Sequence, residues 1–166
     1  MHSDLAADIE RLLDSVWSNR HALVHGDFSP KNLLVWDGGL MLIDFEVGHF
    51  GDPAFDLGFF LAHLVLKTLR ATNARAQHVE LVSEFWKRYV AALAARATDD
   101  ERSQLERRAL RNLGGCLLAR VDGKSRVDYL DEALANVARP LGRRLLTGEV
   151  ATWEELLVTL TGRAGD

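Results

Sequence analysis

A short polar run, His25 to Asn32, carries side chains whose types and spacing suit phosphoryl transfer. Asp27 and Asn32 are separated by four residues, and apolar runs flank the segment. Phosphoryl transfer needs a carboxylate that orients the attacking hydroxyl and accepts its proton. It also needs a nearby oxygen ligand for the magnesium that screens the phosphates. Asp27 suits the first role and Asn32 the second.

A second candidate metal ligand, Asp44, follows the next apolar runs, where a strand is expected to end. Mg²⁺ prefers oxygen ligands and commonly takes only one or two from protein, with water and phosphate supplying the others. Asn32 and Asp44 together are therefore a sufficient ligand set. Glu46 is either a further outer ligand or a loop anchor, and its residue type favours neither.

The elements that must position these residues are predicted from apolar periodicity. Helical spacing indicates an amphipathic helix over residues 4–19, and short runs rich in strand formers follow at 22–24, 33–36 and 40–43. The turn 37–39, Asp-Gly-Gly, joins the last two runs as a hairpin, because glycine tolerates the backbone conformation of tight turns. From residue 54 onward the pattern predicts helices only, at 54–70, 78–97, 99–120, 126–138, 141–147 and 153–161.

Several helix ends are marked by local signals. Thr98 with Glu101, and Thr152 with Glu155, form capping boxes, in which hydroxyl and carboxylate satisfy backbone amides at a helix start. Pro140 suits the first turn of a helix, because it has no amide to satisfy. The predicted fold class is α+β and mostly α, in one domain over residues 1–166.

Composition and charge exclude several classes of protein. Hydrophobic residues make up 48% and charged residues 27%, which is typical of a globular domain. Twenty Lys and Arg against 24 Asp and Glu give a net charge of -4, so no positive field attracts nucleic acid or anionic lipid.

Cys116 is the single cysteine and can form no internal disulfide, which fits a reducing compartment. The apolar stretch Leu57 to Leu66 is shorter than the roughly 20 residues of a membrane span, and no secretory leader is apparent, so we expect a cytoplasmic location.

Three motifs carry a family resemblance: His25-Gly26-Asp27 with Asn32, the run 43–46 (Ile-Asp-Phe-Glu), and the run 51–58 (Gly-Asp-Pro-Ala-Phe-Asp-Leu-Gly). In these motifs, which occur in family order and at close to family spacing, the chain resembles the aminoglycoside phosphotransferase and choline kinase superfamily. That superfamily shares the protein-kinase-like fold. The resemblance implies the C-terminal lobe of such a fold, in which a small β-hairpin bears the catalytic and metal loops on a helical bundle.

Carried over position by position, the resemblance implies Asp27 as catalytic base and Asn32 and Asp44 as ligands of the Mg²⁺ that accompanies ATP. Asp56 would brace the catalytic loop from the start of a helix, where the macrodipole also favours a carboxylate. His25 would shape the loop. Each of these residues taken singly also has an ordinary role in a turn or cap, but the joint pattern favours the site.

The acceptor side is less defined. A charged break between helices at Arg120, Asp122 and Lys124 could line an acceptor pocket, or it is a plain interhelical loop with Ser125 as N-cap. Lys31 either reaches a phosphate or is solvated, as lysines in polar loops commonly are. Within the resembling group the acceptors include aminoglycosides, choline-like amino alcohols, methylthioribose and other sugars, and the expected partner is a small molecule with a hydroxyl.

A kinase also needs a glycine-rich loop over the phosphates, a strand lysine and a glutamate that orients this lysine. Only 24 residues precede His25, so we expect the N-terminal nucleotide-binding lobe to be absent and the chain to be weakly active or inactive alone. Apolar surface that this lobe would cover favours a homo-oligomer or a partner chain.

Two other functions fit part of the sequence. A noncatalytic binding or regulatory module would keep the fold without turnover. A metal-dependent hydrolase could be built from His25, Asp27, Asp44 and His49, since imidazole and carboxylate suit zinc or manganese. The hydrolase leaves Asn32 and the run 51–58 without a role.

Overall fold

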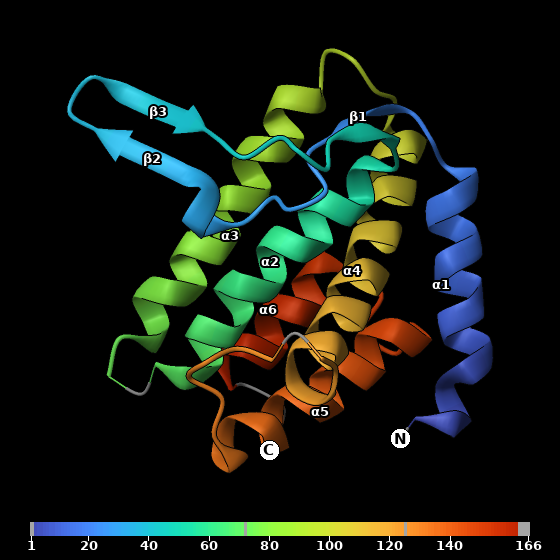
Figure 1. The fold of residues 1–166 in the computed structure, drawn as a ribbon, viewed down its shortest axis with the longest axis vertical. Coiled ribbons are helices and arrows are strands. Elements are labelled where there is room, and N and C mark those ends of the chain that lie inside the picture. The colour runs from blue at the N-terminus through green and yellow to red at the C-terminus, as the bar shows by residue number, and fades with distance from the viewer. Residues whose placement is uncertain (1, 72, 125, 163–166) are drawn as a thin grey trace.

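The computed structural model describes residues 2–71, 73–124 and 126–162. Six α-helices and four short strands follow one another along these residues: α1 (Ala6–Ser18), β1 (Ala22–Val24), β2 (Leu33–Trp36), β3 (Gly39–Leu42), β4 (His49–Gly51), α2 (Pro53–Arg70), α3 (Arg75–Leu93), α4 (Asp99–Asp122), α5 (Glu132–Thr147) and α6 (Trp153–Thr161). Two short 3-10 helices, Ser3–Leu5 and Pro30–Asn32, precede α1 and β2. The strands lie on one side of a helical body (Figure 1). The expected fold class, α+β and mostly α, is confirmed.

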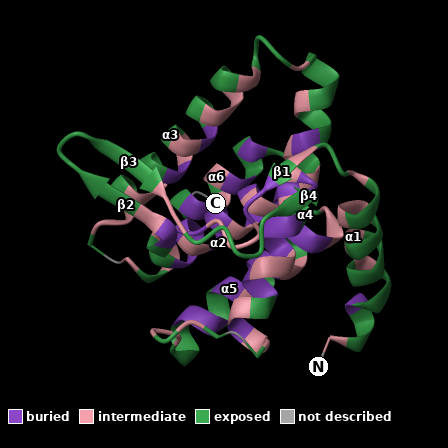
Figure 2. Cartoon of the chain, turned by 45° about the horizontal axis from the view of Figure 1, so that its top comes forward, coloured by how far each residue is buried: buried purple, intermediate pink, exposed green. Residues whose placement is uncertain are grey.

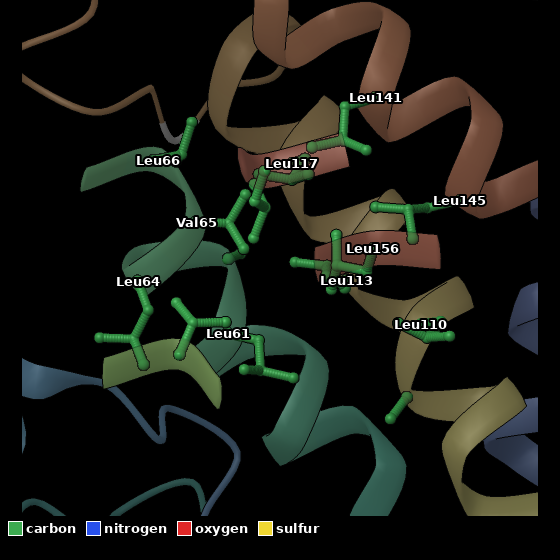
Figure 3. Packing of buried hydrophobic residues seen from close by; sticks show 14 of the residues in the cluster. Leu61, Leu64, Val65, Leu66, Leu110, Leu113, Leu117, Leu141, Leu145 and Leu156 are labelled. Atoms are coloured by element: carbon green, nitrogen blue, oxygen red, sulfur yellow. The ribbon is translucent and has the colours of Figure 1, made fainter. Parts of the chain in front are cut away.

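The core forms where α2, α4, α5 and α6 meet. Apolar side chains from these helices point toward one another and lose contact with water, and many of them are leucines (Figure 3). Leu61, Leu113 and Leu145 are each 0% exposed. The helices α2 and α4 approach closely at Gly58, where an added Cβ would lie 2.5 Å from the Cβ of Asn112. This close approach fixes the position of the first turn of α2.

The strands form two small antiparallel sheets. β1 pairs with β4, with Leu23 opposite Phe50, and β2 pairs with β3, with Leu33 opposite Leu42. The β2–β3 hairpin extends away from the helices, and both of its strands are largely exposed (Figures 1 and 2). The predicted hairpin and its turn are therefore confirmed. Strand β4 was not expected, because three residues joined to a sheet by a single neighbour give too short a pattern to detect.

Both predicted capping boxes are present, at the starts of α4 and α6. The prediction of two helices at 126–138 and 141–147 is wrong: a single helix, α5, begins after its N-cap Asp131 and contains Pro140 in its interior. Proline removes one hydrogen bond from a helix, but buried side chains on both sides of it, including Leu134 and Leu141, hold α5 against the core. Ser125, the alternative N-cap, lies outside the described residues.

Helix α1 lies along α4 at the edge of the body (Figure 1). It contributes no buried residue, and Leu13 and Trp17 on it are 63% and 74% exposed. The turn before it is better anchored, because Leu5 packs with Leu118 and Leu146. Among all the helices that the structure describes, none has the length and apolar character to span a bilayer.

Candidate active site

The loop after β1 is held by a carboxylate from α2. Asp56 accepts hydrogen bonds from the backbone amides of His25, at 2.6 Å, and Gly26, at 3.0 Å. Gly26 has a φ of +80°, and a Cβ there would lie 2.9 Å from the carbonyl oxygen of Val47, so only glycine fits. The carboxylate of Asp56 thus joins the loop to the first turn of α2, which is the contact that a bracing role requires.

His25 connects the loop to the strand end that precedes Asp44. Its Nδ1 accepts a hydrogen bond from the backbone amide of Asp27 at 3.2 Å. The ring proton therefore lies on Nε2, which donates a hydrogen bond to the carbonyl oxygen of Ile43 at 2.8 Å. The ring is buried and packs against Phe45, with ring centroids 4.8 Å apart. Both nitrogens of His25 are therefore engaged in shaping the loop, and neither is available to a metal.

Asp27 lies at the centre of the polar cluster. Its Oδ2 accepts from the side-chain amide of Asn32 at 3.1 Å and lies 2.8 Å from the Nζ of Lys31. Burial alone would raise the pKa of Asp27, but the hydrogen bonds from Lys31 and Asn32 lower it below its usual range. Asp27 is thus a carboxylate at neutral pH. Lys31 keeps an exposed side chain, as expected for a solvated lysine, yet its ammonium is paired with Asp27.

Asn32 and Asp44 occupy the two ends of the β2–β3 hairpin. The amide of Ile43 donates to the carbonyl oxygen of Asn32 at 3.0 Å, which places Asp44 next to Asn32. The side-chain nitrogen of Asn32 is used by Asp27, so its Oδ1 remains for another partner. Asp44 has a φ of +69°, and no other described residue except glycine has a positive φ.

Such a backbone is uncommon for a residue other than glycine, although Asp adopts it more readily than most, and residues with it cluster at functional sites. Within the described part of the chain, no group donates to the exposed carboxylate of Asp44. One amide oxygen and one carboxylate are the donors that Mg²⁺ accepts from protein, so Asn32 and Asp44 fit such an ion. Glu46 is exposed and close by in sequence. No cluster of three or more histidine, cysteine, aspartate or glutamate side chains suited to a metal occurs in the described ranges.

A cavity of about 730 Å³ opens beside Asp27, between α1, α2 and α4. Arg120 and Asp122, both proposed from the sequence as pocket residues, line it. Asp122 is engaged elsewhere, because Arg139 donates to its carboxylate at 2.8 and 2.9 Å and His2 lies 2.9 Å away. Lys124 is exposed and does not belong to the lining. Only part of the charged break therefore faces the cavity.

Arg120 is positioned by two residues of α2. Its guanidinium lies 5.0 Å from the ring centre of Phe59, and its Nη2 lies 3.4 Å from Nε2 of His63. Burial, with the nearby positive charge of Arg120, lowers the pKa of His63 to about 4. His63 is therefore neutral at pH 7. Burial also raises the pKa of Cys116, on the cavity wall, to about 12, which keeps its thiol uncharged.

The sequence did not indicate that several of these residues would meet. The pairing of Lys31 with Asp27 was detectable only as an i,i+4 spacing of opposite charges in a loop. Phe55 and Phe59 line the cavity from α2, and Ile9 and Leu13 line it from α1. Their helical spacing indicates an apolar face, but it does not say that this face borders Asp27.

Comparison with known proteins places these motifs in a family. The model of the phosphotransferase enzyme family matches residues 2–84, half of the chain. Methylthioribose kinase of Erwinia tasmaniensis is 28% identical over 110 residues, which cover 61% of this chain and 28% of the relative. The corresponding enzyme of Klebsiella pneumoniae subsp. pneumoniae is 28% identical over 123 residues, covering 59% and 31%. That of Yersinia pseudotuberculosis serotype IB is 33% identical over 95 residues, covering 50% and 23%.

The matched segment thus spans less than a third of the length of these curated relatives. The family match includes β1, the β2–β3 hairpin and α2, and therefore the segments that carry Asp27, Asn32, Asp44 and Asp56. The chain belongs to the phosphotransferase enzyme family.

Proposed function

We propose that this chain carries the catalytic-loop half of an ATP-dependent phosphotransferase that transfers the γ-phosphate to a hydroxyl of a small molecule. The observation that carries the proposal is the state of Asp27. Lys31 and Asn32 both bind its Oδ2, while Oδ1 has no partner among the described residues. A carboxylate with one oxygen fixed and the other available at a cavity wall is suited to receive the proton of a hydroxyl.

In this proposal the acceptor enters the cavity and its hydroxyl donates a hydrogen bond to Oδ1 of Asp27. The hydroxyl oxygen attacks the γ-phosphorus while its proton passes to Asp27, and ADP leaves. Asn32 keeps the carboxylate in place, and Asp56 keeps the loop against α2. Asn32 Oδ1 and Asp44 would hold magnesium, which when bound with ATP neutralises the phosphate charge. The lobe assignment, a kinase-like C-terminal lobe over residues 1–166, rests on the family and is part of the same proposal.

The two other functions have less support. A hydrolase centre would need His25 as a ligand, but both of its ring nitrogens are engaged with backbone groups. A noncatalytic module would have no use for an available Oδ1 on Asp27 or for the strained backbone of Asp44. Calorimetric titration with ATP and magnesium distinguishes the noncatalytic module. A module that does not use Asn32 and Asp44 as metal ligands should bind the nucleotide equally well in wild type and in Asp44→Asn.

The test is transfer of labelled phosphate from ATP to a panel that contains methylthioribose, choline and an aminoglycoside. The chain contains no G-x-G-x-x-G loop, and effective molarities of about 10⁵–10⁸ M arise only when both reactants are held, so we expect slow transfer by the 166 residues alone. Asp27→Asn should abolish it, with Asp37→Asn as the matched control. Transfer that survives in Asp27→Asn would refute the role of Asp27, and fast transfer would refute the expected weak activity.

Association with another chain is also part of the proposal. The hairpin exposes large apolar side chains, among them Val35 at 75% and Leu40 at 62%. Contiguous apolar surface of this kind tends to be covered in solution. Light scattering after size exclusion should show a mass above 18.5 kDa, and a monomer over the whole concentration range would contradict association of the chain with itself.

A further inference from the structure

The cavity beside Asp27 has mostly apolar walls. Helix α1 contributes Ile9, Leu12 and Leu13, and helix α2 contributes Phe55 and Phe59. Its volume of about 730 Å³ is within the range of small-molecule sites, which are commonly lined by apolar side chains with a few polar groups. The cavity is therefore built to remove an apolar group from water next to the available oxygen of Asp27.

The charges on the lining disfavour a cationic ligand. Its carboxylates are Asp27, paired with Lys31, and Asp122, paired with Arg139. A bound ammonium would meet only carboxylates whose negative charge is already compensated by Lys31 or Arg139, and a cation without its own counter-charge is costly in an apolar site. Arg120 adds a positive charge to the same wall, and His63 and Phe59 fix its guanidinium.

We propose that the acceptor class is an uncharged alcohol with an apolar substituent, and that this substituent occupies the cavity between α1, α2 and α4. The inference rests on the proposed function, because it assumes that the hydroxyl faces Asp27. The proposal excludes polycationic sugars and quaternary amino alcohols as acceptors. The apolar substituent contributes affinity through burial, and Asp27 sets the position of the hydroxyl.

The test measures binding of simple alcohols, so it requires no turnover. Titration of the 166-residue chain with n-propanol, n-pentanol and n-heptanol, followed by NMR, should show affinity rising about fourfold per methylene, the equivalent of ~0.8 kcal/mol. Choline and dimethylbutanol, in which carbon replaces the ammonium nitrogen, form an isosteric pair. Dimethylbutanol should bind at least about tenfold more tightly, because both carboxylates of the lining already have a cationic partner and leave the ammonium charge uncompensated.

A matched pair of variants locates the binding. Ala119 is exposed on α4 and lines the cavity, so Ala119→Leu narrows the cavity without disturbing the core. Ala92 is exposed on α3 and is not part of the lining, which makes Ala92→Leu the control. Ala119→Leu should remove most of the gain from n-pentanol to n-heptanol, and Ala92→Leu should leave it unchanged.

Three results would overturn the inference: affinity that does not increase with chain length, equal loss in both variants, or tighter binding of choline than of dimethylbutanol. The proposed function fails in a different way, through absence of phosphate transfer that depends on Asp27. Length-dependent binding of alcohols without phosphate transfer would retain the cavity assignment and reject the reaction.

Discussion

The side-chain amide of Asn32 donates to two oxygens of Asp27, the backbone carbonyl at 2.9 Å and the carboxylate Oδ2 at 3.1 Å. The side-chain nitrogen of Asn32 therefore connects the two ends of the segment 27–32 and fixes the carboxylate of Asp27. The same bonds turn the remaining oxygen of Asn32 away from Asp27. The base and the first candidate metal ligand are thus oriented by one shared contact.

Removal of the Asp44 carboxylate should abolish the divalent-metal site. Mn²⁺ bound with ATP enhances the relaxation of water protons, and we expect Asp44→Asn to lose this enhancement because Asn32 alone offers only a neutral ligand. Asp37→Asn, at the tip of the same hairpin, should behave as wild type. Unchanged relaxation in Asp44→Asn would show that the metal binds elsewhere.

Removal of the Lys31 ammonium should raise the pKa of Asp27. Burial raises the pKa of Asp27, and Lys31 opposes this by stabilising the charged form of the carboxyl group. In Lys31→Met this opposing effect is lost, so the pKa should rise. Because the base must be deprotonated, the acidic limb of activity should move to higher pH. NMR titration of the aspartate carboxyl carbons measures the shift directly. Lys87→Met, on the exposed face of α3, is the control, and a pKa that moves down or stays constant would contradict the ion pair.

Replacement of Asp56 should destabilise the loop more than the core. In Asp56→Ala the amides of His25 and Gly26 lose their hydrogen-bond acceptor. An unsatisfied buried donor lowers the free energy of unfolding by about 1–3 kcal/mol. We expect a lower urea midpoint and faster amide exchange at residues 25–27. Asp14→Ala, on exposed α1, should change neither. Faster exchange confined to α2 would mean that Asp56 serves only its own helix.

A methyl group at position 58 should separate α2 from α4. The added Cβ of Gly58→Ala meets the Cβ of Asn112 at 2.5 Å and the backbone nitrogen of Leu113 at 2.6 Å, so we expect a loss of about 1–3 kcal/mol. At Gly115 the added Cβ meets only the flexible end of Leu12. Gly115→Ala should therefore be neutral or stabilising by up to about 1 kcal/mol through helix propensity. Equal effects in a denaturation experiment would contradict this description of the helix contact.

The stability of the chain should decrease in mild acid through His63. Its pKa is about 4 in the folded chain and 6.5 as a model group, so the unfolded chain binds the proton more readily. The contribution of His63 to the free energy of unfolding is constant above pH 6.5 and is lost progressively as the pH falls toward 4. Because His63 is only half-buried, solvent reduces the slope below the limit of about 1.4 kcal/mol per pH unit. Urea midpoints of His63→Gln should depend less on pH than those of His78→Gln.

The sequence predicted the elements with strong local signals and missed those made by tertiary contact. Capping residues and the Asp-Gly-Gly turn located α4, α6 and the hairpin, because these signals act within four residues. Pro140 misled the assignment of α5, since packing of Leu134 and Leu141 outweighs the lost hydrogen bond. The roles of Asp27, Asn32 and Asp44 were predicted from residue type and spacing together with the family resemblance, and they stay predictions. The cavity could not be predicted, because it depends on how α1 lies against α4.

The β2–β3 hairpin offers a place for a reporter group. Its strands begin and end beside Asn32 and Asp44, and its tip at residues 37–38 extends away from the helices (Figure 1). A fluorophore attached at Asp37 would be remote from the helical core and yet connected to both candidate ligands through one strand pair, with Leu33 opposite Leu42. A fluorophore at this position would therefore test the proposed binding of metal and nucleotide beside Asn32 and Asp44 without a label at the site itself.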